Sequence, residues 1–443
     1  MIPAQAQQAP VLKACCSLDN RLWRKPQPGS NNEGWIGPVY AEVAQEVLVH
    51  LAHARHGPPD QPLEYAEHLT PPSICLFQRS GHSIVAASFA LDARWGRGET
   101  ARAFAWNQGR AGRVLGDLVG DALMARIGYH CSHEQFPPSE LLQLIQAAEA
   151  AGFDAAMSSD HFRPWGPAQG QSGYAWSFLG AALQATRLPL GVISAPGYRY
   201  HPAILAQAAA TLAEMYPGRL WLCLGSGQRL NEDLTGVAWP EKGERNARLR
   251  ECADAIRALL RGERVSHYGR VTLVDCELYT LPKTPPLLLG AAVSEASAEF
   301  VGGWADGLLT VSGKPEQVRR VVEAFRRGGG EGKPLYMQVG LNWASSEDEA
   351  LWGAHEQWRY NVLGGEVNWE LRSPADFDTA TRHVKPEDMR GSLLISADLN
   401  QHVEWLREYI ALGFEELQLH QVDRNQHAFI EAFGAKVLPQ LRI

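Results

Sequence analysis

The chain has 443 residues, of which 45% are apolar and 20% are charged, and this composition excludes wholesale disorder. A formal net charge of −8 argues against a binder of nucleic acid or anionic membranes, because phosphate groups demand clustered Lys and Arg. The seven cysteines form no C-x-x-C pair, no secretory signal is visible, and no stretch of about 18 apolar residues occurs. We therefore expect a cytoplasmic protein without disulfides or membrane spans.

Residues 1–123 differ from the rest of the chain in their sequence pattern. An amphipathic helix is predicted over Tyr40–Ala54 and an apolar stretch lies at Ser83–Leu91, with Pro- and Gly-rich pieces between them. We expect a poorly structured extension without a catalytic role, or a sequence that precedes the natural start, because Met124 opens a regular pattern.

From Arg126 onward, short apolar runs alternate with helical patterns. The runs are predicted to be buried parallel strands over Arg126–His130, Ala155–Ser158, Leu190–Ser194, Leu220–Leu224, Leu287–Gly290, Leu308–Val311, Leu335–Leu341 and Leu417–Gln421. Eight such repeats predict an α/β fold, a (β/α)8 TIM barrel with insertions, over residues 124–443.

Amphipathic helices are predicted between these strands. One apolar face consists of Leu141, Leu144, Ile145 and Ala148, and another consists of Ile204, Ala208, Leu212 and Met215. Further helices are predicted over Glu244–Leu260, Glu295–Trp304, Pro315–Arg326 and Ala428–Leu438. Two insertions interrupt the alternation, a hairpin at Val265–Leu281 and a polar segment with its own helix at Asn361–Ser396, which we expect to form a lid or a subunit contact.

The loops that follow the strands converge at one end of a TIM barrel, so the candidate site is sought there. After the first strand, HCSHEQF places the carboxylate of Glu134 at this end, although a carboxylate that simply favours a helix N-terminus is the alternative. The neighbouring His130, Cys131 and His133 are almost contiguous, which does not suit the geometry of a metal centre, and we expect no metal site.

After the second strand, SSDHFRPW brings together Asp160, His161 and Trp165. Histidine is the side chain best suited to move protons near neutral pH, and its place at a strand end makes a purely structural role less fitting.

The next three strand ends offer small residues. GVISAPGYRYHP after the third strand lets the backbone approach a flat ligand. After the fourth strand, LGSGQRLNE is not a dinucleotide fingerprint, but Asn231 and Glu232 are candidate polar contacts, with helix capping as the alternative. After the fifth strand, GAAVSEAS is a small-residue loop that enters a helix and suits a cofactor phosphate, which is compatible with an ordinary N-cap at Ser294.

Taken together, three segments resemble the luciferase-like family of flavin-dependent oxidoreductases. They are RIGYHCSHEQFPPSELLQLIQAAEAAGFDAAMSSDHFRPW, GYRYHPAILAQAAATLAEMYPGR and LGSGQRLNE. The resemblance runs from Arg126 to about Leu438. It is strongest to the branch typified by the deazaflavin-dependent glucose-6-phosphate dehydrogenases. Within this branch, the chain resembles a subfamily of flavin oxidoreductases not tied to the deazaflavin coenzyme more closely than it resembles the sugar-phosphate enzymes.

The resemblance implies roles for particular residues. His161 corresponds to the proton donor, Trp165 lines the substrate pocket, and Glu134 is a nearby active-site carboxylate. It also implies that the cofactor is contacted by Asp160, Ser194, Ala195, Asn231, Val293, Ser294, Ala296 and Ser297.

Two departures from the sugar-phosphate dehydrogenases matter. Gln228 stands where they have a catalytic Glu, and the insert RVTLVDCELY lacks the Lys that would grip a phosphate. We therefore expect no oxidation of glucose 6-phosphate.

The resemblance implies an enzyme that acts on a small organic substrate by hydride transfer or by oxygen insertion, as in the luciferase-like monooxygenases. It also implies a homodimer. FMN is the first expectation for the cofactor, and a deazaflavin is the alternative. A strict deazaflavin-dependent reductase and a catalytically silent flavin-binding protein remain the alternative functions.

Overall fold

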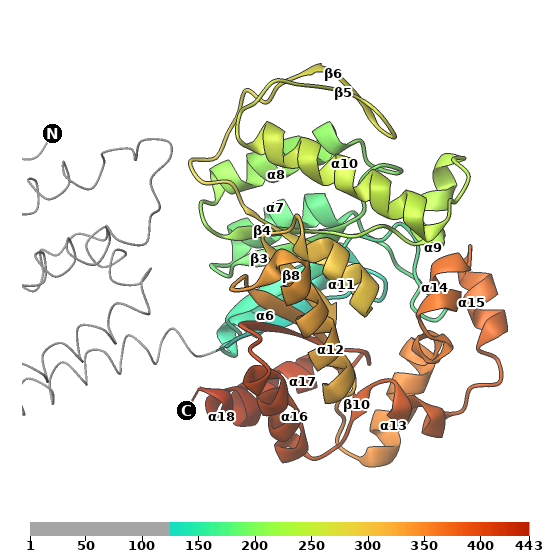
Figure 1. Cartoon of the computed structure of the whole chain (residues 1–443). Helices are drawn as coiled ribbons and strands as arrows, with labels where there is room; N and C mark the ends of the chain where they lie inside the picture. Colours follow the sequence, from blue (N-terminus) through green and yellow to red (C-terminus); the bar gives the residue numbers. More distant parts are fainter. Residues whose placement is uncertain (1–124, 443) are drawn as a thin grey trace, which may run out of the picture. The chain divides into compact units, whose positions relative to one another are not determined.

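The computed structural model describes residues 125–442, and the predictions for residues 1–123 lie outside the described residues (Figure 1). Its centre is a closed parallel barrel, in which pairing runs β1-β2-β3-β4-β7-β8-β9-β11 and returns to β1. The strands are β1 (Arg126–Cys131), β2 (Ala155–Ser159), β3 (Leu190–Ser194), β4 (Leu220–Leu224), β7 (Leu287–Ala291), β8 (Gly307–Val311), β9 (Leu335–Asn342) and β11 (Glu416–Gln421). The predicted TIM barrel is confirmed, and every predicted strand bound is correct to within one residue.

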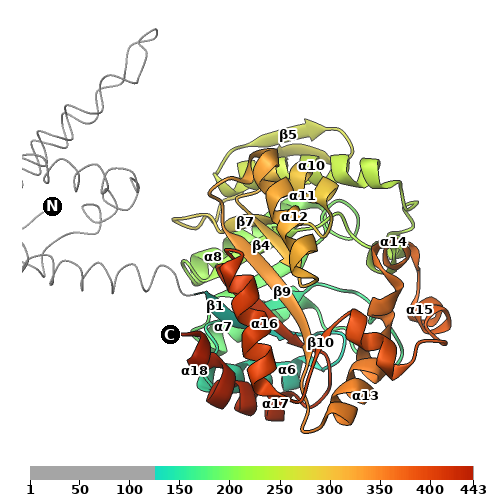
Figure 2. The same ribbon diagram turned by 60° about the horizontal axis from the view of Figure 1, so that its bottom comes forward.

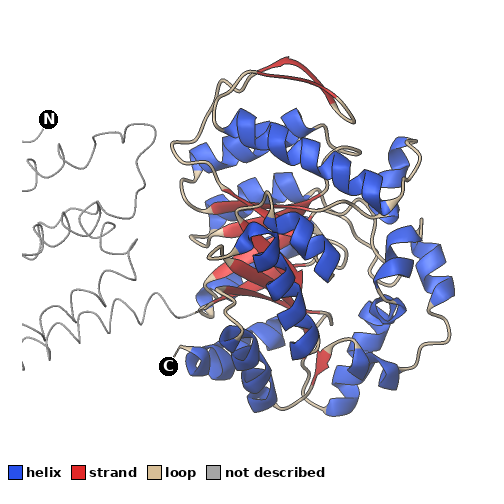
Figure 3. Ribbon diagram, viewed as in Figure 1, coloured by secondary structure: helices blue, strands red, loops and turns tan. Residues whose placement is uncertain are grey.

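Helices form a layer around the barrel, as Figures 2 and 3 show from two directions. The longer ones are α6 (Pro138–Ala150), α7 (Ala175–Ala185), α8 (Pro202–Met215), α10 (Lys242–Leu260), α11 (Glu295–Gly302), α12 (Pro315–Phe325), α13 (Glu347–Trp358), α16 (Leu399–Ala411) and α17 (Gln426–Ala432). Helices α6, α8 and α12 each begin at a proline, whose fixed φ and missing N–H suit the first helical position. None of the helices within residues 125–442 is long and apolar enough to cross a membrane.

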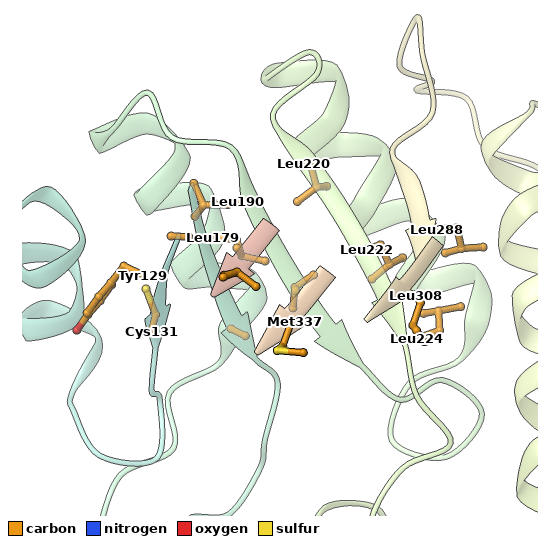
Figure 4. Packing of buried hydrophobic residues seen from close by; sticks show 14 of the residues in the cluster. Tyr129, Cys131, Leu179, Leu190, Leu220, Leu222, Leu224, Leu288, Leu308 and Met337 are labelled. Carbon is orange, nitrogen blue, oxygen red and sulfur yellow. The ribbon is translucent and has the colours of Figure 1, made fainter. Parts of the chain in front are cut away.

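The side chains of β4 show how the core divides into two layers. Leu220, Leu222 and Leu224 point outward and pack beneath the helices (Figure 4). Trp221 and Cys223 alternate with them and point into the barrel, where they join Met157, Leu289, Leu309 and Tyr336. The barrel is therefore filled with side chains, and a ligand must bind at its end.

The predicted helix face is correct for α6, and for α8 it is correct at Leu212 and wrong at Ile204 and Met215. Leu141, Leu144, Ile145 and Ala148 of α6 are all buried. In α8, however, Ile204 and Met215 are 56% and 54% exposed, and the buried face consists of Leu205, Ala206, Ala209, Ala210, Leu212 and Ala213. The prediction selected the larger side chains, whereas the alanines form a smooth face that can approach the strands closely.

Both predicted insertions are present. Strands β5 (Val265–Tyr268) and β6 (Thr272–Cys276) form an antiparallel hairpin, whose Arg270 side chain pairs with Glu251 of α10. The second insertion contains α14 (Gly365–Glu370), α15 (Pro374–Ala380), a 3-10 turn (Pro386–Gly391) and β10 (Leu394–Ile395), which extends the sheet beside β9.

The second insertion packs on loops at the C-terminal end of the barrel. The side chain of Arg163, from the loop after β2, donates to the carbonyl of Arg372 at 2.8 Å. Arg245 of α10 pairs with Glu370 at 3.3 Å. This arrangement places the insertion beside the candidate site.

Candidate active site

A carboxylate and an imidazole meet where β1 and β2 end. Oε1 of Glu134 lies 2.6 Å from Nδ1 of His161, and the Ser132 hydroxyl donates to Oε2 of Glu134 at 3.1 Å. Glu134 does not belong to the first turn of α6, which carries Glu140 instead. The helix-terminus alternative for Glu134 is therefore not what the structure shows.

The pair is buried unequally. The side chain of Glu134 is 2% exposed, and that of His161 is 16% exposed. Burial on its own raises the pKa of Glu134, but the attraction of His161 outweighs it and lowers the pKa to about 2. Glu134 is therefore a carboxylate across the physiological pH range, which favours a proton on the Nδ1 atom that faces it.

Trp165 stands beside His161, with the two ring centroids 5.4 Å apart. On its other side it packs against Phe377 of the second insertion at 5.3 Å and Trp358 at the end of α13 at 6.2 Å. Phe377 is fully buried. The predicted Trp165 thus has an apolar support that the sequence did not reveal, since the insertion reads as polar.

Asp160 is held by several groups within the protein. Ser194 donates to Oδ2 at 2.9 Å, Tyr200 donates to Oδ1 at 3.0 Å, and Arg199 pairs with Oδ1 at 3.2 Å. Ser194 in turn accepts from the indole N–H of Trp176 at 3.2 Å. The structure thus brings Asp160 and Ser194 together, and their contact with a cofactor stays a prediction.

The loop after β4 braces the loop that carries His161. The amide oxygen of Asn231 accepts from the backbone N–H groups of Phe162 and Arg163 at 2.9 and 3.1 Å. Its amide nitrogen donates to the side-chain oxygen of Gln228 at 3.2 Å. Asn231 and Gln228 therefore lie together next to the Glu134–His161 pair, and their predicted roles toward cofactor and substrate remain predictions.

Glu232, which the sequence offered as a polar contact, is a buried carboxylate in the same loop. It is 2% exposed and accepts the backbone N–H of Arg199 at 3.2 Å. Burial raises its pKa to about 7 although Arg199 opposes the shift. Asp160 and Glu232 thus share Arg199, a residue that sequence reasoning passed over although it stands in the quoted GYRYHP segment.

Small residues line the strand ends next to this network. Ala195 follows β3, Gly225 follows β4, and a Cβ added at Gly225 would meet only the side chain of Ala291, at 3.7 Å. Gly227 has a φ of +81°, where a side chain is strained, and a Cβ there would lie 2.9 Å from Glu232. These strand ends therefore carry small residues, which suits the close approach of the backbone to a flat ring such as that of a flavin-type cofactor.

The predicted phosphate loop is exposed at the start of α11. The Ser294 hydroxyl caps the helix by accepting from the backbone N–H of Ser297 at 3.4 Å, and Val293 and Ala296 are exposed beside it. On the neighbouring β4 end, the Lys242 ammonium donates to Ser226 at 2.7 Å, and burial lowers the pKa of this lysine to about 8. A helix N-terminus and a cation on adjacent strand ends fit an anionic cofactor tail.

The side chains of HCSHE diverge. His130 points into the barrel, Cys131 lies in the outer core, His133 packs on Phe178 of α7, and Glu134 meets His161. Within residues 125–442, no three His, Cys, Asp or Glu side chains are grouped as metal ligands would be.

Comparison with known proteins identifies the family. The family model described as luciferase-like monooxygenase matches residues 119–416. This chain belongs to that family. The predicted family and its class of enzyme, an oxidoreductase, are thereby confirmed.

Several relatives are named for the cofactor F420, a deazaflavin. An F420-dependent glucose-6-phosphate dehydrogenase from Nakamurella multipartita is 36% identical over 329 residues, which cover 72% of this chain and 96% of that protein. A protein of the same name from Mycobacterium tuberculosis is 33% identical over 330 residues, 72% of this chain and 98% of its own length.

Solved structures extend the comparison. An F420-dependent secondary alcohol dehydrogenase in complex with an F420–acetone adduct is 27% identical, with a TM-score of 0.68 over 72% of this chain and 100% of that one. A long-chain alkane monooxygenase is 14% identical with a TM-score of 0.56, which shows the shared fold alone. These similarities support a flavin-type cofactor for the family member described here.

Proposed function

We propose that this chain is an F420-dependent oxidoreductase that exchanges a hydride between the deazaflavin and an uncharged alcohol or the corresponding carbonyl compound. The observation that carries the proposal is the Glu134–His161 pair beside Trp165, at a barrel end whose neighbouring strand ends carry small residues. The named relatives support F420 over FMN, because those most similar in sequence carry F420 in their names.

The chemistry needs only one proton-transfer residue. When an alcohol is oxidised, its C–H hydrogen leaves as a hydride, which the deazaflavin accepts when bound, and its O–H hydrogen leaves as a proton. His161 takes this proton on Nε2, because ionised Glu134 holds a proton on Nδ1 and then stabilises the imidazolium. In the reverse direction, His161 returns the proton to the carbonyl oxygen. The absence of a carboxylate at Gln228 therefore does not prevent this reaction.

Substrate charge follows from the surroundings of His161. Trp165, which contacts His161, and Trp358, which contacts Trp165, carry no charge. Arg199 is already engaged by Asp160 and Glu232. This favours an uncharged substrate over a sugar phosphate. The luciferase-like family name also supports a flavin monooxygenase, in which the same pair would face reduced FMN and oxygen.

The test is turnover by the full chain with oxidised F420. The panel contains propan-2-ol, butan-2-ol, cyclohexanol and glucose 6-phosphate, and the loss of the visible absorption of the deazaflavin is followed. We expect turnover of at least one uncharged alcohol and none of glucose 6-phosphate. His161→Asn is expected to lower kcat/KM at least about 100-fold with F420 affinity within about twofold of wild type.

His427→Asn serves as the matched control, because His427 is exposed on α17 and lies outside the site. Oxygen consumption with reduced FMN, in the absence of any reaction with F420, would replace this proposal by the monooxygenase.

A further inference from the structure

Two buried histidines stand side by side on neighbouring strands of the barrel. His130 lies one residue before the end of β1 and is 3% exposed, His420 lies in β11 and is 1% exposed, and their ring centroids are 4.3 Å apart. Both face inward. Gly128 and Gln418, two residues earlier on each strand, meet inside the barrel, where a Cβ on Gly128 would lie 2.1 Å from the Gln418 side chain. Side chains two residues further along point the same way and lie nearer the site.

The hydrogen bonds of this pair are incomplete. The amide nitrogen of Gln338 lies 3.2 Å from Nδ1 of His420, so Nδ1 accepts and the proton of His420 resides on Nε2. Neither Nε2 of His420 nor Nδ1 of His130 finds a partner among the side chains and backbone of residues 125–442. Buried polar groups are normally hydrogen-bonded, and these two nitrogens, like the Gln418 side-chain oxygen deeper in the barrel, have no partner among the described residues.

Comparable ring nitrogens elsewhere have a different setting. Nδ1 of His161 has the Glu134 carboxylate at 2.6 Å as its one neighbour of opposite charge, whereas Nδ1 of His133 and Nδ1 of His402 also find no partner in the described part of the chain. His133, however, packs on Phe178, and His402 packs on Trp405 and Phe433, all of them in the helical layer. Among these four, His130 and His420 are the two that face the barrel interior.

A continuous arc of rings joins the histidine pair to the reactive end of the site. His420 contacts Trp358, with centroids 4.6 Å apart, Trp358 contacts Trp165 at 6.2 Å, and Trp165 contacts His161 at 5.4 Å. At the other end, His130 precedes Glu134 by four residues on the same strand end. A substrate that rests on this arc would touch His161 at one point and the histidine pair at another.

The pair is neutral, which restricts the ligand. Burial lowers the pKa of His420 to about 3, and burial followed by the neighbouring His420 lowers the pKa of His130 well below its usual range. His133 and His161 lower the pKa of His130 further, and of the facing groups only Glu134 raises it. A neutral imidazole offers one donor and one acceptor, which matches a hydroxyl group better than a phosphate or carboxylate.

We propose that His130 and His420 form a second oxygen-binding subsite, and that the substrate is an uncharged compound with two oxygen functions. Its reacting carbinol lies at His161, and a second hydroxyl or carbonyl oxygen lies at the histidine pair. This inference rests on the proposed function and narrows its substrate class.

The test compares alcohols that differ only in a second hydroxyl. The full chain is assayed with F420 and cyclohexanol, and then with cyclohexane-1,2-diol, -1,3-diol and -1,4-diol. We expect kcat/KM for the best diol to exceed that for cyclohexanol at least about tenfold, mostly through KM, because a buried donor is left unpaired by the mono-alcohol. Equal values of kcat/KM for cyclohexanol and all three diols would overturn the subsite and leave the proposed function standing.

Variants show whether the two histidines cause the preference. The variants His420→Phe and His130→Phe keep a ring and remove its nitrogens. In each, the ratio of kcat/KM for the best diol to kcat/KM for cyclohexanol is expected to fall to within about twofold of one. His420→Gln restores a donor and should keep part of the preference. The ratio is measured within each variant, so a loss of folded protein cancels.

The matched control is His402→Phe, an equally buried imidazole on α16 that should keep the wild-type ratio. A wild-type ratio in both His420→Phe and His130→Phe would also overturn the subsite. No turnover of cyclohexanol and the three diols, with turnover of propan-2-ol or butan-2-ol, would overturn the subsite alone. No turnover of any alcohol in either panel would overturn the proposed function, and the subsite with it.

Discussion

Replacing Glu134 by glutamine removes a buried negative charge and leaves the shape of the side chain nearly unchanged. Glu134 is 2% exposed, and one of its oxygens lies 2.6 Å from His161 while the other accepts from Ser132. A glutamine can keep the hydrogen bond of Ser132, but it carries no negative charge to stabilise a proton on Nδ1 of His161. The variant therefore isolates the contribution of the charge.

The size of the expected loss of stability in Glu134→Gln follows from the pKa of Glu134. Its value of about 2 in the folded protein lies below the ordinary 4.5, a difference that corresponds to roughly 3 kcal/mol of stability. Because the folded pKa is the lower one, this stability is fully present above pH 4.5 and is lost as the pH falls through about 2. At pH 7 we expect Glu134→Gln to lower the free energy of unfolding by about 3 kcal/mol, and at pH 3 by about half as much.

Urea unfolding of wild type and variant between pH 7 and pH 3 measures this difference. Glu214→Gln is the control, because Glu214 is exposed on α8, and it should change the free energy of unfolding by less than about 0.5 kcal/mol at every pH. A loss below about 1 kcal/mol at pH 7 in Glu134→Gln would refute the reasoning, as would a loss that grows on acidification.

Two further predictions concern neighbouring groups. Phe377→Ala removes a fully buried ring from beside Trp165 and should lower the free energy of unfolding by about 3 kcal/mol. It should also make residues 361–396 cleavable at lower protease concentration. An unchanged cleavage pattern would contradict this prediction. For Glu232, whose folded pKa of about 7 lies above the ordinary 4.5, stability is present at low pH and lost as the pH rises through 7. The free energy of unfolding of Glu232→Gln relative to wild type should therefore rise by about 2 kcal/mol between pH 5 and pH 8 in urea unfolding, and parallel curves would contradict it.

The sequence predicted the barrel well because its strands are short apolar runs that are buried on both faces, as β4 shows with leucines outward and Trp221 and Cys223 inward. The predicted face of α8 was wrong at Ile204 and Met215, because in an alanine-rich helix the large side chains do not by themselves mark the buried side. Periodicity identifies a face only where the large apolar residues are the ones that pack.

The candidate site was predictable in part. Glu134, Asp160, His161 and Asn231 stand at strand ends that a parallel barrel brings together, and the structure places them within one network of contacts. The contact of Trp165 with Phe377 was not predictable, because a polar insertion without periodicity gives no sign of which residue turns inward. The pairing of His130 with His420 depends on closure of the barrel between its first and last strands, so no local pattern announces it.

The most direct test of the central claim is a titration of the full chain with F420 and, separately, with FMN, followed by the quenching of tryptophan fluorescence. Trp165 and Trp358 lie at the proposed site, so binding there should change the signal. We predict saturable binding of F420 near one equivalent per chain, and at least about tenfold weaker binding of FMN. Tight binding of FMN with no binding of F420, or no binding of either, would contradict it.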